Sequence, residues 1–255
     1  MSIPEKKKYR NNFVTNAICR LDFRPVAELN GELIDKFRDT VKKEFPVVQE
    51  NIIKSYAAKF KQGEILEQEP LPDQKIYNFI DVNSENKIEL GNDHIVIESF
   101  KYINFRIFSK IIKKSFDSLL NIVKDPDYTR LGLRYINQIV LSSGNPLIWT
   151  GYIDNSFTSV IDKFFERSPN LSRAMSQVVL NYDDYKLNFN YGMHNSEFPS
   201  KISRKEFILD FDFYTEYVEN DAIMDLLSKF NKETAILFEK CIKEKLRNKM
   251  EVIDE

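Results

Sequence analysis

Two arginines share one face of a predicted β-strand near the middle of the chain. Apolar and polar residues alternate over residues 130–139, a pattern typical of a strand with one buried face. The alternation puts Arg130 and Arg134 on the polar face, with Gly132 between them. Two guanidinium groups on one face can hold a carboxylate or a phosphate through paired hydrogen bonds, and the glycine would let such a ligand approach the backbone.

Other predicted strands also carry polar residues on the face opposite their apolar residues. Asn188 lies on one of them, and Asp210 and Asp212 lie on another. Such polar faces also include Asn16, Arg20, Asp22, Lys186 and Asn190. If these strands join one sheet or two facing sheets, the polar face can bind a planar anion or a small polar ligand. We therefore predict a ligand-binding face made of Arg130, Arg134, Asn188, Asp210 and Asp212.

The alternative for this face is a solvated sheet surface on which cross-strand ion pairs satisfy one another. Each such pair contributes only about 0.2–1 kcal/mol. Any half-buried antiparallel sheet shows the same alternation, so the pattern is compatible with both interpretations. Whether the face forms a cleft or lies open to water decides between them.

The sequence has no signature of a common enzyme class. It contains no Gly-x-Ser-x-Gly elbow, no phosphate loop and no dinucleotide-binding fingerprint, and it has only seven glycines. The two histidines lack the spacing of a metal site: His94 is predicted to flank a turn and His194 to end a strand. Asp210 and Asp212 could share a divalent cation, but the sequence does not indicate a third ligand. We predict no catalytic residue, no metal and no cofactor.

A stretch without acidic residues covers residues 101–115, most of which are predicted to be helical. Arg106, Lys110 and Lys113 form a basic stripe along this helix, where they could meet a phosphate backbone or an acidic protein. A solvated helix face is the alternative. Because 37 basic and 39 acidic residues nearly cancel, the chain as a whole does not attract nucleic acid.

The single tryptophan, Trp149, lies in a short aromatic segment with Tyr152. Tryptophan and tyrosine are enriched among the residues that dominate binding at protein interfaces. We predict that Trp149 packs where the two halves of the chain meet. The alternative is that Trp149 and Tyr152 form a partner interface.

The elements that must position these residues follow a similar order in both halves of the chain. Three short alternating runs and then a long amphipathic pattern occur in each half, which predicts an antiparallel meander followed by a long helix. The predicted meander strands are residues 76–82, 87–90, 94–99, 176–181, 186–191 and 206–213. Helices are predicted at 31–45, 157–165 and about 221–246, in addition to the basic helix, and 47–69 fits either a helix or a strand.

The predicted fold class is therefore α+β, with antiparallel sheets packed by long helices. We expect a single unit over residues 13–255 that consists of two lobes, at about 13–148 and 149–255. The common order of elements predicts a structural pseudo-repeat, although no residue-level repeat accompanies it. Residues 1–12 are polar and basic, and we expect them to be disordered or frayed.

Composition indicates a folded protein that stays inside the cell. The 255 residues are 42% hydrophobic, which is enough for a sizeable core. No apolar run approaches the roughly 18 residues of a membrane span, and no apolar segment follows the charged N-terminus. The two cysteines, Cys19 and Cys241, fit a reducing compartment better than a disulfide framework. We expect a cytoplasmic protein that does not contact membranes.

Several segments together resemble a sporadically distributed family of prokaryotic conserved hypothetical proteins of about this length. The most specific of them is Leu-Gly-Leu-Arg-Tyr-Ile-Asn at residues 131–137. The others, in chain order, are residues 16–23, 45–46, 149–153 and 209–212. The family has no assigned activity, and its patchy distribution resembles that of cargo on mobile elements such as defence or toxin–antitoxin islands. The resemblance implies an interaction or sensing role and transfers no catalytic residue.

Together these observations favour a recognition protein, meaning a sensor, a regulator or a subunit of a complex, that binds a protein partner or a small polar ligand. One alternative is a metal-assisted enzyme on a phosphorylated or nucleotide substrate, with Arg130 and Arg134 as phosphate clamps. In that enzyme Asp210 or Asp212 would be a metal ligand or a base. A second alternative is a nucleic-acid binder that uses the basic stripe.

Overall fold

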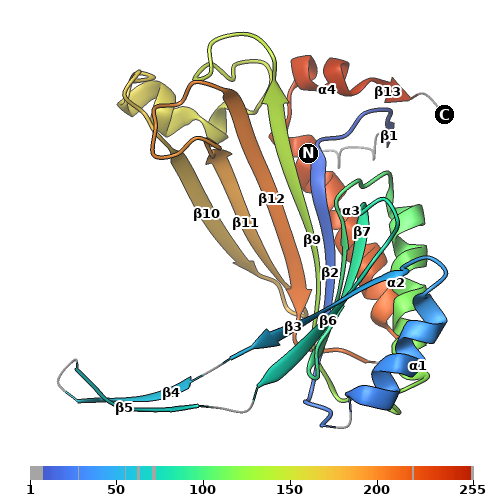
Figure 1. Cartoon of the computed structure of the whole chain (residues 1–255). Coiled ribbons are helices and arrows are strands. Elements are labelled where there is room, and N and C mark those ends of the chain that lie inside the picture. Colours follow the sequence, from blue (N-terminus) through green and yellow to red (C-terminus); the bar gives the residue numbers. More distant parts are fainter. Residues whose placement is uncertain are drawn as a thin grey trace.

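In the part of the chain that the structure describes, nine strands form one continuous antiparallel sheet, and α1, α2 and α3 lie on the same side of it (Figure 1). The structure is a computed structural model, and it describes residues 8–27, 29–54, 56–61, 64–70, 73–219 and 221–253. The sheet contains β2 (Val14–Phe23), β3 (Val47–Ile53), β6 (Gln74–Ile80), β7 (Asn86–Leu90), β8 (His94–Ser99), β9 (Tyr128–Leu141), β10 (Ala174–Asn181), β11 (Lys186–Met193) and β12 (Lys205–Thr215). The α-helices are α1 (Gly31–Val41), α2 (Phe105–Leu120), α3 (Ile223–Cys241) and α4 (Glu244–Met250).

The strand order places the two predicted meanders on opposite sides of a central pair. Across the sheet the strands follow the order β10-β11-β12-β9-β2-β8-β7-β6-β3. The long strands β2 and β9 are neighbours at the centre, the meander of β6, β7 and β8 adjoins β2, and the meander of β10, β11 and β12 adjoins β9. The predicted α+β class is therefore confirmed, with both halves of the chain in one sheet. The division into two lobes and the pseudo-repeat stay predictions.

Alternation along the strands separates a core face from an open face. Leu133 of β9 pairs with Cys19 of β2 on one side and with Phe213 of β12 on the other. All three side chains are buried in the core that the helices cover. Because successive side chains of a strand point to opposite sides, the residues next to them lie on the face away from these helices.

The long helix α2 shows how the helical layer is built. Its N-cap, Asn104, accepts a hydrogen bond from the backbone N–H of Ile107 at 3.0 Å, which satisfies one of the free donors of the first turn. The predicted buried stripe is present at Phe108, Ile112 and Phe116. Within the described ranges, no helix is long and apolar enough to cross a membrane.

The predicted final helix at 221–246 is interrupted, which is a correction. α3 ends at Cys241, Ile242 has an extended backbone, and α4 begins two residues later. Ile242 forms a β-bridge with Ile153, and Asp154 donates its backbone N–H to the Cys241 carbonyl at 2.7 Å. The segment after Trp149 therefore binds the backbone groups that a continuous helix would have used itself.

In two other segments the structure decides between a helix and another form. The ambiguous region 47–69 forms β3 and a separate two-stranded ribbon of β4 (Tyr56–Lys61) and β5 (Glu64–Pro70), which projects beyond the main sheet in Figure 1. Valine and isoleucine at both ends of β3 favour the strand, because β-branched side chains lose rotamers in a helix. The predicted helix at 157–165 is replaced by a 3₁₀ turn, η1 (Asn155–Phe157), and a π-helical turn, η2 (Val160–Phe164).

The ends of the described chain meet each other. β1 (Lys8–Tyr9) pairs with β13 (Val252–Ile253), and the Tyr9 hydroxyl donates to the carboxylate of Glu239. Arg247 also binds that carboxylate, at 3.0 Å. Within the predicted frayed segment 1–12, residues 1–7 lie outside the described residues.

Candidate binding face

The open face of the sheet carries polar side chains from five neighbouring central strands. β9 contributes Arg130 and Arg134, and β12 contributes Asp210 and Asp212. Further charged side chains on this face are Arg20 and Asp22 of β2, Lys87 and Glu89 of β7, and His94 and Glu98 of β8. The pairing register places them on one side, because Arg130 is opposite Asp22 and Asp212 is opposite Arg134.

Arg134 is fixed by a paired contact with Asp210. Its Nε donates to Oδ1 and its Nη2 donates to Oδ2, both at 2.8 Å, and Asn190 donates to Oδ2 at 3.2 Å. Asp210 is only 5% exposed, whereas the Arg134 side chain is 40% exposed. The hydrogen bonds from Arg134 to Asp210 raise the pKa of the guanidinium above its ordinary value. Asp210 thus holds a charged guanidinium whose remaining edge faces outward and can meet another acceptor.

Arg130 lies between two carboxylates and an aromatic ring. Its guanidinium is 3.8 Å from Asp22 and 3.6 Å from Asp212, and it lies over the ring of Tyr214 at 4.6 Å. It also covers Gly132, since a Cβ on that glycine would be 3.4 Å from Nη1 of Arg130. The space above Gly132 is therefore filled by Arg130, which corrects the expectation that a ligand approaches the backbone there.

The ionisation of Asp212 depends both on its burial and on the nearby arginines. Burial raises its pKa above the ordinary value, while Arg130 and Arg134 act in the opposite direction. Asn188 lies directly opposite it in the β11–β12 ladder. The five residues predicted as a ligand-binding face are therefore neighbours on three adjacent strands.

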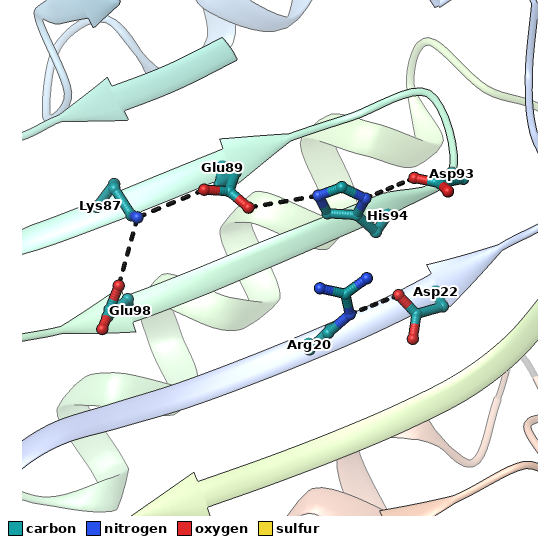
Figure 2. Close-up of polar contacts among 7 residues, drawn as sticks. All are labelled: Arg20, Asp22, Lys87, Glu89, Asp93, His94 and Glu98. Atoms are coloured by element: carbon teal, nitrogen blue, oxygen red, sulfur yellow. Dashed lines mark hydrogen bonds and ion pairs between the residues drawn. The ribbon is translucent and has the colours of Figure 1, made fainter. Parts of the chain in front are cut away.

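A histidine cluster extends the open face toward β7 and β8, as Figure 2 shows. The His94 ring lies between Asp93, at 2.5 Å from Nδ1, and Glu89, at 3.4 Å from Nε2. Lys87 bridges Glu89 and Glu98 at 3.5 and 3.4 Å. The hydrogen bond with Glu89 raises the pKa of His94 above its ordinary 6.5, and Asp93 contributes in the same direction, although burial opposes the shift.

Sequence reasoning placed His94 at a turn and missed this cluster. The signal was present in the alternation of β8, where His94 and Glu98 point to the same face. Linking them to Glu89 of β7 and Asp22 of β2 required the pairing of three strands. A tight approach to the preceding loop fixes the ring, because a Cβ on Gly91 would lie 2.6 Å from it. The histidine is therefore held in place by backbone shape as well as by its carboxylates.

Beside Arg134 the open face is hollowed. A depression of about 440 Å³ is lined by Arg134, Asp210, Asn190 and His194, together with Gln177 of β10. His194, which the sequence predicts to end a strand as a surface or general-base residue, thus lies with the predicted ligand-binding residues. The depression offers a guanidinium, two amides and an imidazole to one ligand, and the carboxylate of Asp210 is bound to Arg134. Such donors suit a carboxylate or phosphate group.

A larger hollow of about 700 Å³ lies elsewhere, beside α1 and β6. Four of its five charged groups already pair with one another: Arg38 is 3.1 Å from Asp35, and Lys75 is 2.7 Å from Glu50. The fifth, Asp73, is exposed. These exposed pairs leave no half-buried charge to recognise a ligand. The depression beside Arg134 is therefore the better candidate site.

Neither cysteine is suited to nucleophilic chemistry. Cys19 and Cys241 are buried, and burial raises the pKa of both thiols, that of Cys241 to about 12. Neither is therefore a thiolate nucleophile near neutral pH. In the described ranges no group of three or more His, Cys, Asp and Glu side chains is placed to hold a metal ion.

Trp149 belongs to the core, which corrects the alternative that assigns it to a partner interface. It is 1% exposed and packs on Phe207 with ring centroids 5.2 Å apart. Together with the partly buried Tyr152 it encloses the ammonium of Lys205, which lies 5.2 and 4.9 Å from the two ring centroids. A side chain that is already buried offers no area to a partner.

The basic stripe of Arg106, Lys110 and Lys113 is exposed on α2, in the helical layer. It is partly neutralised there. Lys113 forms an ion pair with Asp117 at 2.8 Å, and the neighbouring Lys114 pairs with Glu44 at 2.6 Å. The stripe therefore presents less free positive charge than the sequence pattern predicts.

Comparisons with known proteins do not assign the chain to a family. No protein-family model matches the chain, and no curated protein matches it in sequence. The family resemblance carried by residues 131–137 therefore stays a prediction. A proposal for the function therefore rests on the arrangement of the open face.

Proposed function

We propose that this protein is a recognition protein that binds a protein partner or a small polar ligand on the open face of its sheet. One observation carries the proposal. The long helices lie on one side of a nine-stranded sheet, within the described ranges, and the other side carries Arg134 fixed to the buried Asp210 beside a hollow.

The burial of the carboxylates supports recognition over a merely solvated surface. Removing a carboxylate from water is costly even when an arginine pairs with it, so ion pairs like these are weak contributors to stability. Asp210 and Asp212 are nevertheless both shielded, and each lies close to an arginine. Such an arrangement holds the guanidinium groups in position before a ligand arrives, which lowers the entropy cost of binding.

The ligand that fits the depression carries an acidic group. Arg134 presents a free guanidinium edge, and Asn190 and His194 line the same space. A carboxylate side chain of a protein partner and the acidic group of a small molecule share this chemistry. Arginine matches both by paired hydrogen bonds that lysine does not reproduce.

The test is native mass spectrometry of the protein purified gently, at low salt, from its host. We expect a bound species that is retained by the wild type and lost in Arg134→Ala. Lys113→Ala removes an exposed cation from the helical layer and should retain the species, so it is the matched control. Retention in Arg134→Ala would refute the proposed site, and a retained nucleotide would favour the enzyme alternative.

Two finer proposals accompany this function. We propose that the halves of the chain are related lobes, supported by the shared order of long strand, three-stranded meander and long helix. We also propose a cytoplasmic role in a small operon of the defence or toxin–antitoxin kind. The family resemblance and the two free, buried cysteines support that role.

A further inference from the structure

The edge strand β10 lacks the usual protection of a sheet edge. Among the described strands it pairs with β11 alone, over its full length from Ala174 to Asn181. Natural edge strands avoid further pairing through charges, prolines, bulges or short length. β10 has eight residues, none of them charged or proline, and its pairing with β11 has no register shift.

Both faces of β10 also carry exposed apolar side chains. Val179 is 52% exposed on the open face, and Val178 and Leu180 are 38% and 40% exposed on the other face. An uncharged strand with exposed valines on both sides and a free edge is a template for a further strand. The strand is about 27 Å long at 3.4 Å per residue, which is long enough for a regular ladder.

The register shows which backbone groups are free. Tyr182 donates its N–H to the Tyr185 carbonyl at 2.8 Å across the hairpin turn, so these two form a hydrogen-bonded pair. Hydrogen-bonded and non-bonded pairs alternate along an antiparallel ladder. Gln177 and Val179 therefore belong to non-bonded pairs with β11, and their N–H and C=O groups point away from the sheet.

Charges at the ends of β10 select its partner. Arg173 precedes the strand and Asp183 follows it, and both side chains are exposed. Each lies five residues from Val178, so a second β10 laid antiparallel with Val178 opposite Val178 brings Arg173 of each copy opposite Asp183 of the other. The same register puts Gln177 opposite Val179, so the outward backbone groups of both strands meet.

The opposite edge of the sheet does not allow this self-pairing. β3 carries Glu50 at its centre, so an antiparallel second β3 centred there would bring two Glu50 carboxylates together. Like charges directly opposite each other on paired strands are destabilising. Glu50 is also engaged by Lys75 at 2.7 Å. Of the two edges, β10 alone is self-complementary in charge.

We propose that β10 pairs antiparallel with β10 of a second copy of this chain, with Val178 at the two-fold axis and Arg173 opposite Asp183 at both ends. The two nine-stranded sheets then form one continuous sheet, and their open faces lie side by side. Because Gln177 lines the depression beside Arg134, each ligand site adjoins the dimer contact. A contact through a single strand is small for a specific interface, so the dimer should dissociate on dilution.

Sedimentation velocity on the full chain, over a wide range of protein concentration, tests this. The wild type should pass from one chain to two as concentration rises. Gln177→Pro removes an outward N–H without touching the ladder with β11, so this variant should remain monomeric. Val47→Lys places a charge on the other edge, at a side chain of similar exposure to Val179, and should dimerise like the wild type, whereas Val179→Lys should not.

Charge exchange tests the register independently of folding. Arg173→Asp or Asp183→Arg alone should weaken dimerisation at least about tenfold, which corresponds to about 1.4 kcal/mol. The double exchange should restore it. Arg173 also stacks on Phe198 and donates to the His194 carbonyl. Both contacts are lost in the Arg173 single variant and in the double variant, so they do not affect the comparison between these two.

Three results would overturn the proposal. They are a wild type that stays monomeric at every concentration, a dimer that survives Gln177→Pro, and a double exchange that dimerises no better than either single variant. Far-UV circular dichroism of each variant establishes that its sheet is intact. Loss of Arg134-dependent ligand binding would leave these outcomes unchanged, so the dimer and the proposed function fail separately.

Discussion

At the scale of single residues, the ionisation of each group on the open face depends on its neighbours. The hydrogen bond from His94 lowers the pKa of Glu89, and the same contact raises the pKa of His94. Asp212 shows the opposite balance, since its burial outweighs two nearby arginines and raises its pKa. The charge pattern that a ligand meets is therefore set by cross-strand contacts and changes with pH.

Replacing His94 should remove a pH-dependent part of stability. Its pKa is raised in the folded state, so protonated His94 stabilises the fold fully below its unfolded pKa of about 6.5. That contribution is lost as pH rises through the folded pKa. We expect His94→Gln to be less stable than wild type at mildly acidic pH, with the difference shrinking above 6.5, as measured by urea unfolding across pH.

At still lower pH, protonation of Glu89 limits how much protonated His94 stabilises the fold. The pKa of Glu89 is lowered, so its contribution is lost as pH falls through that lowered pKa, below the ordinary 4.5. A difference in unfolding free energy that did not vary with pH would contradict the pairing. His194→Gln, on the same face but without such a carboxylate pair on its ring, is the control.

At the scale of elements, the segment between β9 and η1 is anchored to the start of β12. Trp149 donates its indole N–H to the Pro146 carbonyl at 3.0 Å and packs on Phe207 of β12. Lys205 donates to the carbonyl of Asn145 at 3.1 Å and to that of Ile148. A connecting loop is thus tied to the end of a central strand.

Truncation of this anchor should cost much stability. Trp149→Ala removes a fully buried ring, and large-to-small changes of this kind cost about 3–5 kcal/mol. Phe164→Ala removes a large side chain that is 79% exposed and should change stability by less than about 0.5 kcal/mol. Equilibrium unfolding of both variants measures this. Equal stabilities would show that Trp149 does not support the core.

At the scale of the whole molecule, a net charge of only −2 conceals local separation of charge. The open face holds arginines, a histidine and carboxylates in fixed positions, whereas the basic stripe on α2 is partly neutralised by Asp117. Recognition through such a face depends on local fields, since the global field is weak.

The complex retained by the open face should therefore weaken as salt is added. Exposed charges are screened over about 10 Å at 0.1 M ionic strength, so the association rate should fall with salt. Surface plasmon resonance with the retained partner or ligand over a salt series measures this rate. An association rate that is independent of salt would indicate an apolar contact instead of the proposed charged one.

Individual residues show which features of the site can be predicted from the sequence. Alternation alone assigns Arg130 and Arg134 to the polar face of their strand, because the period of a strand is two regardless of its neighbours. It does the same for Asp210 and Asp212 on theirs. Sequence reasoning leaves Trp149 either packed inside the protein or at a partner interface, because burial depends on what packs over a side chain. No local pattern carries that information.

The sequence by itself determined the α+β class, the positions of most strands and long helices, and the division of each strand into an apolar and a polar face. These follow from periodicity and turn residues, which are local. Only the tertiary structure decided that one sheet joins both halves, that Arg130 fills the space over Gly132, and that His94 meets Glu89 and Asp93. Such contacts depend on strand order and register, and these are set by the packing of residues far apart in the chain.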